Sequence, residues 1–169
     1  TGKIIVGGLS IISSTVSKPV VARYLSNGDL DTTFNSNGIR LLWITGLDYQ
    51  YYFSLEDLTV QTNGKITGVG WRDFPGLSWD SDYWACRINS DGSMDNTFSS
   101  DGVNVYNGSF NGHDRAFAMQ LLSSGNFLMA GGGYLTTLAY DYTLVEINVN
   151  GSVGSLSATS DFGSNDIAY

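Results

Sequence analysis

The sequence is poor in cysteine, proline and basic residues. One cysteine, Cys86, occurs in 169 residues, so no disulfide can form within the chain. Only two prolines accompany 21 glycines, which indicates many turns rather than a disordered tract. Eight Lys and Arg stand against sixteen Asp and Glu. The resulting net charge of −8 argues against nucleic acid, whose binding requires a basic surface, and it disfavours an anionic membrane surface.

Long apolar runs are missing as well. None approaches the roughly eighteen residues that a membrane-spanning helix requires. Apolar residues nevertheless make up 42% of the chain, including eight Phe, ten Tyr and four Trp, so a sizeable core can form. The sequence starts without an initiator methionine or a signal peptide, and we expect a processed chain or a fragment of a longer protein.

Two sets of similar segments recur along the chain with one period. The first set is TGKIIVGG, NGKITGVG and SGNFLMAGG, whose lead glycines are spaced 62 and 61 residues apart. The second set is VARYLSNGDLDTTF, ACRINSDGSMDNTF and LVEINVNGSVG, whose turn glycines are spaced 64 and 59 apart. We therefore predict one repeat domain over 1–169, with units at 1–53, 54–112 and 113–165 and the start of a further unit at 166–169.

Each unit is predicted to hold four strands. Short apolar runs that end in glycine are typical of buried strands, and Asn-Gly or Asp-Gly pairs favour tight turns. The segment that starts at Asp114 is the best helix candidate, but its repeat partner LEDLTVQTNG is typical of a strand, so both are predicted as strands. The predicted fold class is all-β, with about three four-stranded, blade-like repeats of a β-propeller or propeller-like array.

Four residues are predicted to have a structural role in the turns. Asp31 and Asp95 follow the turn glycines, where a carboxylate can accept backbone N–H bonds. Phe34 and Phe98 come three residues later and can fill the core beside the turn. The same aspartates are calcium candidates together with Asp29 and Asp91. Neither turn clusters enough carboxylates for a calcium loop, so we predict no metal and no other cofactor.

The repeated pattern resembles that of a known family. A Gly-Lys-Ile strand is followed by Ala-Arg, an Asp-Gly turn and an Asp-x-x-Phe segment, which is similar to the delta-sixty repeat of bacterial β-propeller-like proteins. The third unit departs from the pattern, with Glu146 in place of Arg23 and Arg87, Gly154 in place of the aspartate, and a late Phe162. The resemblance implies a propeller-like fold in large, secreted or surface-exposed proteins without an assigned activity.

Catalytic residues are not evident. His113 is the single histidine, and no Gly-x-Ser-x-Gly motif accompanies it. Glu56 and Asp57 are adjacent, so a regular strand would point them to opposite sides, a poor geometry for glycoside hydrolysis. Cys86 aligns with Ala22 and is expected to be a small buried residue. We predict that the chain is not an enzyme.

Two aromatic segments are the best binding candidates. The segment WRDFPGLSWDSDYW combines rings with carboxylates, groups that can stack on and hydrogen-bond a sugar, and LDYQYYF is a second such loop. The alternative is that the rings pack the blades together, which we favour for Trp71 and Trp84. The predicted ligand-binding residues are Trp79, Asp80, Asp82, Tyr83 and Tyr51.

The preferred function is a non-catalytic binding or adhesion module, extracellular or at the cell surface and at the tip of a fibre or surface protein. It would recognise glycan or protein, without nucleic acid or membrane insertion. The alternatives are a structural spacer repeat in a large surface protein and a glycan-active enzyme. We expect the strand at 3–6 to pair with residues 166–169 or with another polypeptide, as a homo-oligomer or part of a longer repeat chain.

Overall fold

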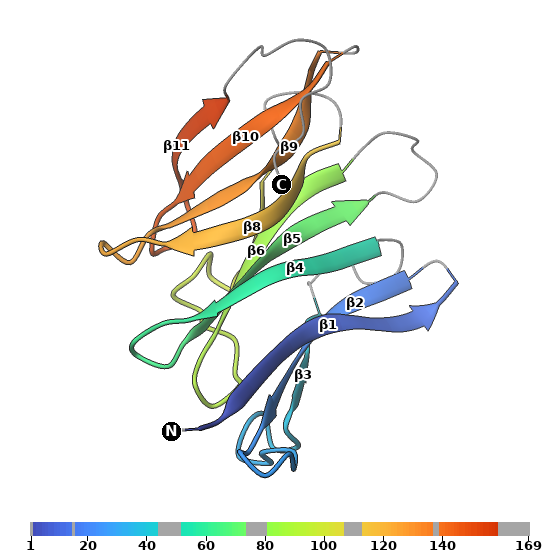
Figure 1. Cartoon of the computed structure of the whole chain (residues 1–169), viewed down its shortest axis with the longest axis vertical. Helices are drawn as coiled ribbons and strands as arrows, with labels where there is room; N and C mark the ends of the chain where they lie inside the picture. Colours follow the sequence, from blue (N-terminus) through green and yellow to red (C-terminus); the bar gives the residue numbers. More distant parts are fainter. Residues whose placement is uncertain are drawn as a thin grey trace.

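The computed structural model of the chain consists of three antiparallel β-sheets that are stacked face to face like blades (Figure 1). The structure describes residues 2–14, 16–43, 52–73, 81–106, 113–136 and 139–158. No helix in these ranges is long and apolar enough to cross a membrane. The predicted all-β, blade-like fold class is confirmed.

Each sheet is a meander in which neighbours in the chain are neighbours in the sheet. The first blade has the order β1-β2-β3, the second β4-β5-β6-β7, and the third β11-β10-β9-β8. The strands of the first two blades are β1 (Ile4–Ser13), β2 (Val16–Tyr24), β3 (Ile39–Leu41), β4 (Tyr52–Val60), β5 (Ile66–Asp73), β6 (Ser81–Ile88) and β7 (Val103–Tyr106). Those of the third blade are β8 (Arg115–Leu121), β9 (Phe127–Thr136), β10 (Ala139–Ile147) and β11 (Val153–Ala158). The segment with the strongest helix character therefore forms β8, as predicted from its repeat partner β4.

Two apolar clusters hold the blades together. The cluster between the first and second blades contains Val21, Phe34, Leu42, Phe53, Ile66, Trp84, Cys86, Ile88 and Val103. The cluster between the second and third blades contains Val69, Tyr83, Ala85, Phe98, Tyr106, Ala116, Phe127, Met129, Val145 and Ile147. Since a single sheet buries only the face that another sheet covers, the core of this molecule lies between its blades.

The edge strands β4 and β8 both contain a β-bulge. The register shifts between Leu55 and Asp57 in β4 and between Ala116 and Ala118 in β8. The partner strand approaches closely beside each bulge: a Cβ on Gly70 would lie 1.9 Å from the Ser54 carbonyl oxygen. This explains why the repeated Gly-Lys-Ile strand carries glycine at this point, because no side chain can be accommodated there.

The third blade closes its last hairpin differently from the second. In the second blade a long turn separates the end of β6 at Ile88 from the start of β7 at Val103. In the third blade β11 already begins at Val153, two residues after the turn glycine Gly151, and pairs directly with β10. The third unit thus forms a four-stranded sheet without the Asp-x-x-Phe turn of the other two.

Candidate functional site

The strand connections divide the molecule into two ends. At one end, which we call the turn end, lie the tight glycine turns, such as 26–28 and 90–92. At the other end, which we call the loop end, β3 is connected to β4 and β5 to β6 (Figure 1). Tyr52, the first residue of β4, is the register partner of Asp73, the last residue of β5, and Asp73 pairs in turn with Ser81. Tyr52, Asp73 and Ser81 therefore lie at the same end of the second blade.

Exposed aromatic rings flank the 44–51 segment at the loop end. Trp43, just before residue 44, is 53% exposed, and Tyr52, just after residue 51, is 37% exposed. The Tyr52 hydroxyl donates a hydrogen bond to the carbonyl oxygen of Ser14 in the β1–β2 connection. The Lys18 ammonium is buried beside Trp43, 5.5 Å from its ring centre and 5.3 Å from that of Phe53. The rings are thus held in place by neighbouring groups while part of each faces solvent.

A second aromatic group at this end combines a ring with three charged side chains. The Arg115 guanidinium lies over the Trp71 ring, 4.1 Å from its centre, and its Nη2 lies 3.2 Å from Asp73 Oδ2. The Trp71 indole N–H donates a 2.8 Å hydrogen bond to Glu56 Oε1. One face of Trp71 is therefore covered by Arg115, which gives this ring a packing role. The carboxylates of Asp73 and Glu56 remain partly accessible beside it.

The predicted binding residues are distributed unevenly over the described part of the chain. Tyr51, Trp79 and Asp80 lie outside the described residues. Asp82 is buried and accepts two hydrogen bonds from Arg72, at 2.9 and 2.7 Å. Tyr83 is 2% exposed, and its hydroxyl bonds Thr143 Oγ1 and the carbonyl oxygen of Gly132 in the third blade. Asp82 thus pairs within its own sheet and Tyr83 links the second blade to the third, and their contact with a ligand stays a prediction.

The histidine has a serine partner that lies far away in the sequence. Ser81 Oγ and His113 Nδ1 are 2.6 Å apart, and the backbones of the two residues form a parallel bridge between β6 and the start of the third blade. Ser81 is fully buried, and Arg115 Nε donates a long 3.4 Å hydrogen bond to its oxygen. A nucleophilic serine has to reach its substrate. The buried position of Ser81 instead suits a polar link between two blades.

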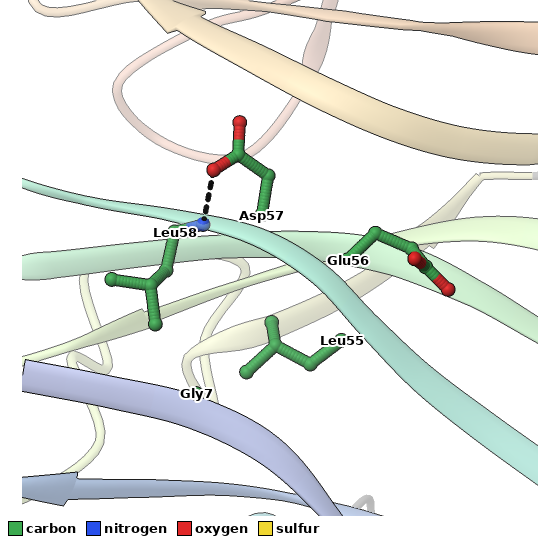
Figure 2. Close-up of a pocket in the computed structure, with 5 residues that line it drawn as sticks. All are labelled: Gly7, Leu55, Glu56, Asp57 and Leu58. Carbon is green, nitrogen blue, oxygen red and sulfur yellow. Dashed lines mark hydrogen bonds between the residues drawn. The ribbon is translucent and has the colours of Figure 1, made fainter.

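The adjacent acids Glu56 and Asp57 border a hollow of about 170 Å³ between β1 and β4. Figure 2 shows their side chains pointing in different directions, with Leu55 and Leu58 turned toward Gly7 of β1. Asp57 Oδ1 accepts the backbone N–H of Leu58, and Asp57 Oδ2 accepts that of Met119 in β8. Asp57 therefore links the bulges of two blades, while Glu56 accepts the indole N–H of Trp71, so the two carboxylates serve different partners.

At the turn end, each turn aspartate is the centre of a cluster of hydrogen bonds and ion pairs. Asp31 Oδ1 accepts bonds from the backbone N–H and the hydroxyl of Thr33, at 3.1 and 2.6 Å. Its other oxygen pairs with Lys3 Nζ at 2.6 Å and Arg23 Nε at 2.8 Å. Phe34, beside the Asp31 cluster, is fully buried. These hydrogen bonds, first of all the one from Lys3, hold the pKa of Asp31 well below its usual range.

The second blade repeats this hydrogen-bonded cluster around Asp95. Thr97 donates two bonds to Asp95 Oδ1, and the cations of Lys65 and Arg87 lie against Oδ2. Burial acts to raise the pKa of Asp95, but the bonds from Lys65, Thr97 and Arg87 outweigh it and hold the pKa low. Phe98 is fully buried beside them. Within the described ranges, no group of three or more His, Cys, Asp or Glu side chains is arranged to hold a metal ion.

The arginines that bond the turn aspartates also connect neighbouring blades. Arg23 Nη1 donates to the carbonyl oxygen of Ser90 in the next blade, and Arg87 Nη1 donates to that of Val149 in the blade after it. In the third blade Glu146 replaces the arginine and accepts bonds from Asn126 and Ser155 of its own sheet. Cys86, beside Arg87 in sequence, is fully buried, and burial raises the pKa of its thiol to about 12, which keeps it protonated.

Comparison with known proteins supports the propeller character of these repeats. A family model described as a domain of unknown function (DUF5122) beta-propeller matches residues 1–34 and 61–98, which end at the two turn phenylalanines. The matched segments cover less than half of the chain, and they show that the chain is similar to a β-propeller-like repeat family. No curated protein matches the chain.

Proposed function

We propose that this chain is a non-catalytic binding module of an extracellular or cell-surface protein, and that it recognises a glycan at its loop end. The observation that carries the proposal is that exposed aromatic rings and carboxylates lie together at the loop end. Trp43 and Tyr52 flank the 44–51 segment, and Asp73, the register partner of Tyr52, opens the 74–80 segment that contains Trp79. Aromatic rings pack on the apolar faces of sugars, and carboxylates accept hydrogen bonds from their hydroxyls.

The non-catalytic part of the proposal is supported by the partners of the candidate acids and nucleophiles. Asp57 accepts two backbone N–H groups, Ser81 is fully buried, and burial keeps the Cys86 thiol protonated. Each group therefore has a structural use that competes with catalysis. A binding function requires only a rigid framework and surface rings, which the stacked blades supply.

We also propose that the repeats are delta-sixty repeats and that the module lies at the exposed tip of a fibre or surface protein. The repeat pattern is complete in the first two units, from the Gly-Lys-Ile strand to the turn phenylalanine. A structural spacer is the main rival function, because the same rings can serve only to pack blades. A protein ligand is the second rival, since exposed aromatic residues also recognise proteins.

Retention of the chain on an array of glycans tests the proposal. We expect the unaltered chain to bind a defined subset of glycans and Trp79→Ala to lose at least about tenfold in affinity, a change of about 1.4 kcal/mol. Leu25→Ala is the matched control, because Leu25 is an exposed apolar residue at the turn end, 37% exposed. Circular dichroism spectra identical to that of the unaltered chain show that each variant is folded. Equal binding by Trp79→Ala, or no glycan bound by the unaltered chain, contradicts the proposal and favours a spacer.

A further inference from the structure

The first blade has an apolar face that is exposed on β1 and at Ile39 of β3 and partly exposed on β2. We call this the upstream face, because the equivalent face of each later blade is turned toward the preceding blade. On β1 it presents Ile4 and Val6, which are 51% and 48% exposed, and on β3 it presents Ile39, which is 37% exposed. Ile4 and Val6 pair with Tyr24 and Ala22 of β2, so the face runs across all three strands. An apolar sheet face of this extent is unusual on a protein surface.

The same face is buried in the other two blades. Ile66, Cys86 and Ile88 of the second blade take the places of Ile4, Ala22 and Tyr24, and all are at most 1% exposed. They pack against residues of the first blade, including Val21 and Phe34. The equivalent face of the third blade, with Phe127 and Ile147, packs in the same way against the second. The molecule therefore contains two examples of how an upstream face is covered, and in both the cover is the opposite face of another blade.

A face of the covering kind is open on the third blade. We call it the downstream face, and Val21 of the first blade and Ala85 of the second represent it in the two internal contacts. Leu144 takes the place of Val21 and Ala85 in the repeat, and it is 39% exposed. Ala130, its register partner in β9, lies beside it and is partly exposed. The two end blades therefore carry open faces of the two kinds that meet in the internal contacts, but the third blade lacks the turn phenylalanine that Phe34 and Phe98 supply there.

The charges of the two end blades are complementary. Residues 2–43 contain four Lys or Arg and two Asp, whereas residues 113–158 contain one Arg and three Asp or Glu. Two first blades brought together would repel each other, and so would two third blades. Attraction between the ends of different molecules therefore favours contact between a first blade and a third blade.

We propose that the upstream face of the first blade binds the downstream face of the third blade in a second copy of this chain. The contact joins unlike surfaces, so it can be made twice, and two copies then close into a ring. Two copies of three blades bring six blades together, a number within the range of about four to eight that propellers use. Closure covers both open apolar faces at once.

The residue at position 146 sets the strength of this contact. In both internal contacts an arginine donates to a turn carbonyl of the next blade, Arg23 to Ser90 and Arg87 to Val149. Glu146, which accepts bonds from Asn126 and Ser155 of its own sheet, takes the equivalent place. The contact between copies lacks this charged hydrogen bond, and it is therefore weaker than the contacts within one chain. The ring dissociates on dilution, whereas the three blades of each chain stay together.

Two variants and their mixture test the proposal by light scattering coupled to size exclusion. Val6→Asp places a charge on the upstream face, and Leu144→Asp places one on the downstream face. Both side chains are partly exposed, so each chain should fold, and circular dichroism checks this. Ile11→Asp is the control, because Ile11 is 80% exposed on β1 and its side chain alternates to the other side of the strand from Val6.

The expected result is the mass of two chains for the unaltered protein and for Ile11→Asp, and the mass of one chain for each face variant alone. An equimolar mixture of Val6→Asp and Leu144→Asp should recover the mass of two chains, because one intact upstream face then meets one intact downstream face. A single-chain mass for the unaltered protein at high concentration overturns the proposal. So does a Leu144→Asp chain that stays paired, because that result shows contact between two like faces, or no recovery in the mixture.

Discussion

The upstream faces of the first and second blades are equivalent in the repeat but differ in their surroundings. Isoleucine occupies the same place in both, as Ile4 and as Ile66, yet Ile4 is 51% exposed and Ile66 is 1% exposed. The difference arises from the neighbour, because Ile66 is covered by the first blade while Ile4 is not. Burial in a repeat array is thus decided by the contact between units rather than by the sequence of one unit.

Truncation of the two isoleucines should sharpen this comparison most strongly. We expect Ile66→Ala to lower the free energy of unfolding by about 2–5 kcal/mol, because it leaves a cavity between two blades. Ile4→Ala should cost less than about 1 kcal/mol at low protein concentration, because its side chain is already half in solvent. Chemical denaturation of both variants measures the difference. Equal losses would show that the first blade is covered even in the isolated chain.

Removal of an arginine that links two blades should have the next largest effect. Arg87 bonds Asp95, Thr97 and the Val149 carbonyl oxygen, and its guanidinium lies over the Phe98 ring. We expect Arg87→Ala to cost about 1.5–3 kcal/mol, since it removes hydrogen bonds between charged and buried groups.

Glu146→Ala is the matched control for Arg87→Ala, because Glu146 takes the place of Arg87 in the third blade. Its bonds stay within its own sheet, so the loss should be smaller than that of Arg87→Ala. Thermal unfolding followed by circular dichroism compares the two variants. A larger loss for Glu146→Ala would contradict the proposed role of the arginine between blades.

Acidification should weaken the first two blades through their turn aspartates. The pKa values of Asp31 and Asp95 are lower in the folded protein than in the unfolded chain, where an aspartate titrates near about 3.9. Their contribution to stability is therefore fully present above about pH 5 and is lost as the pH falls below about 4. We expect Asp95→Asn to be less stable than the unaltered chain at pH 7, with the gap narrowing toward pH 3. A gap that does not change with pH would rule out this linkage.

The local part of the fold was accessible from the sequence. Short apolar runs that end in glycine predicted the strands, and the repeat period assigned the segment at 115–121 to a strand in spite of its helical composition. The positions of Asp31 and Asp95 after their glycines led to the expectation of backbone hydrogen bonds, and Thr33 and Thr97 donate them in the structure. These features depend on contacts within one unit, where sequence spacing is informative.

Contacts between units were not accessible in the same way. Ser81 and His113 are 2.6 Å apart, but they are 32 residues apart in the sequence and belong to no repeated motif. The position of Lys18 between two rings likewise depends on how the first blade meets the second. The absence of the Asp-x-x-Phe pattern from the third unit showed that this unit differs from the others. It did not predict the direct β10–β11 hairpin that takes the place of the turn.

Amide hydrogen exchange of the unaltered chain tests the central claim most directly, because one sample reports on both equivalent strands. Peptides from residues 4–13 cover the exposed strand β1, and peptides from residues 66–73 cover its buried equivalent β5. If the upstream face of the first blade binds a second copy, exchange in residues 4–13 slows as the protein is concentrated, while exchange in residues 66–73 stays constant. Exchange in residues 4–13 that is fast and independent of concentration would contradict the account.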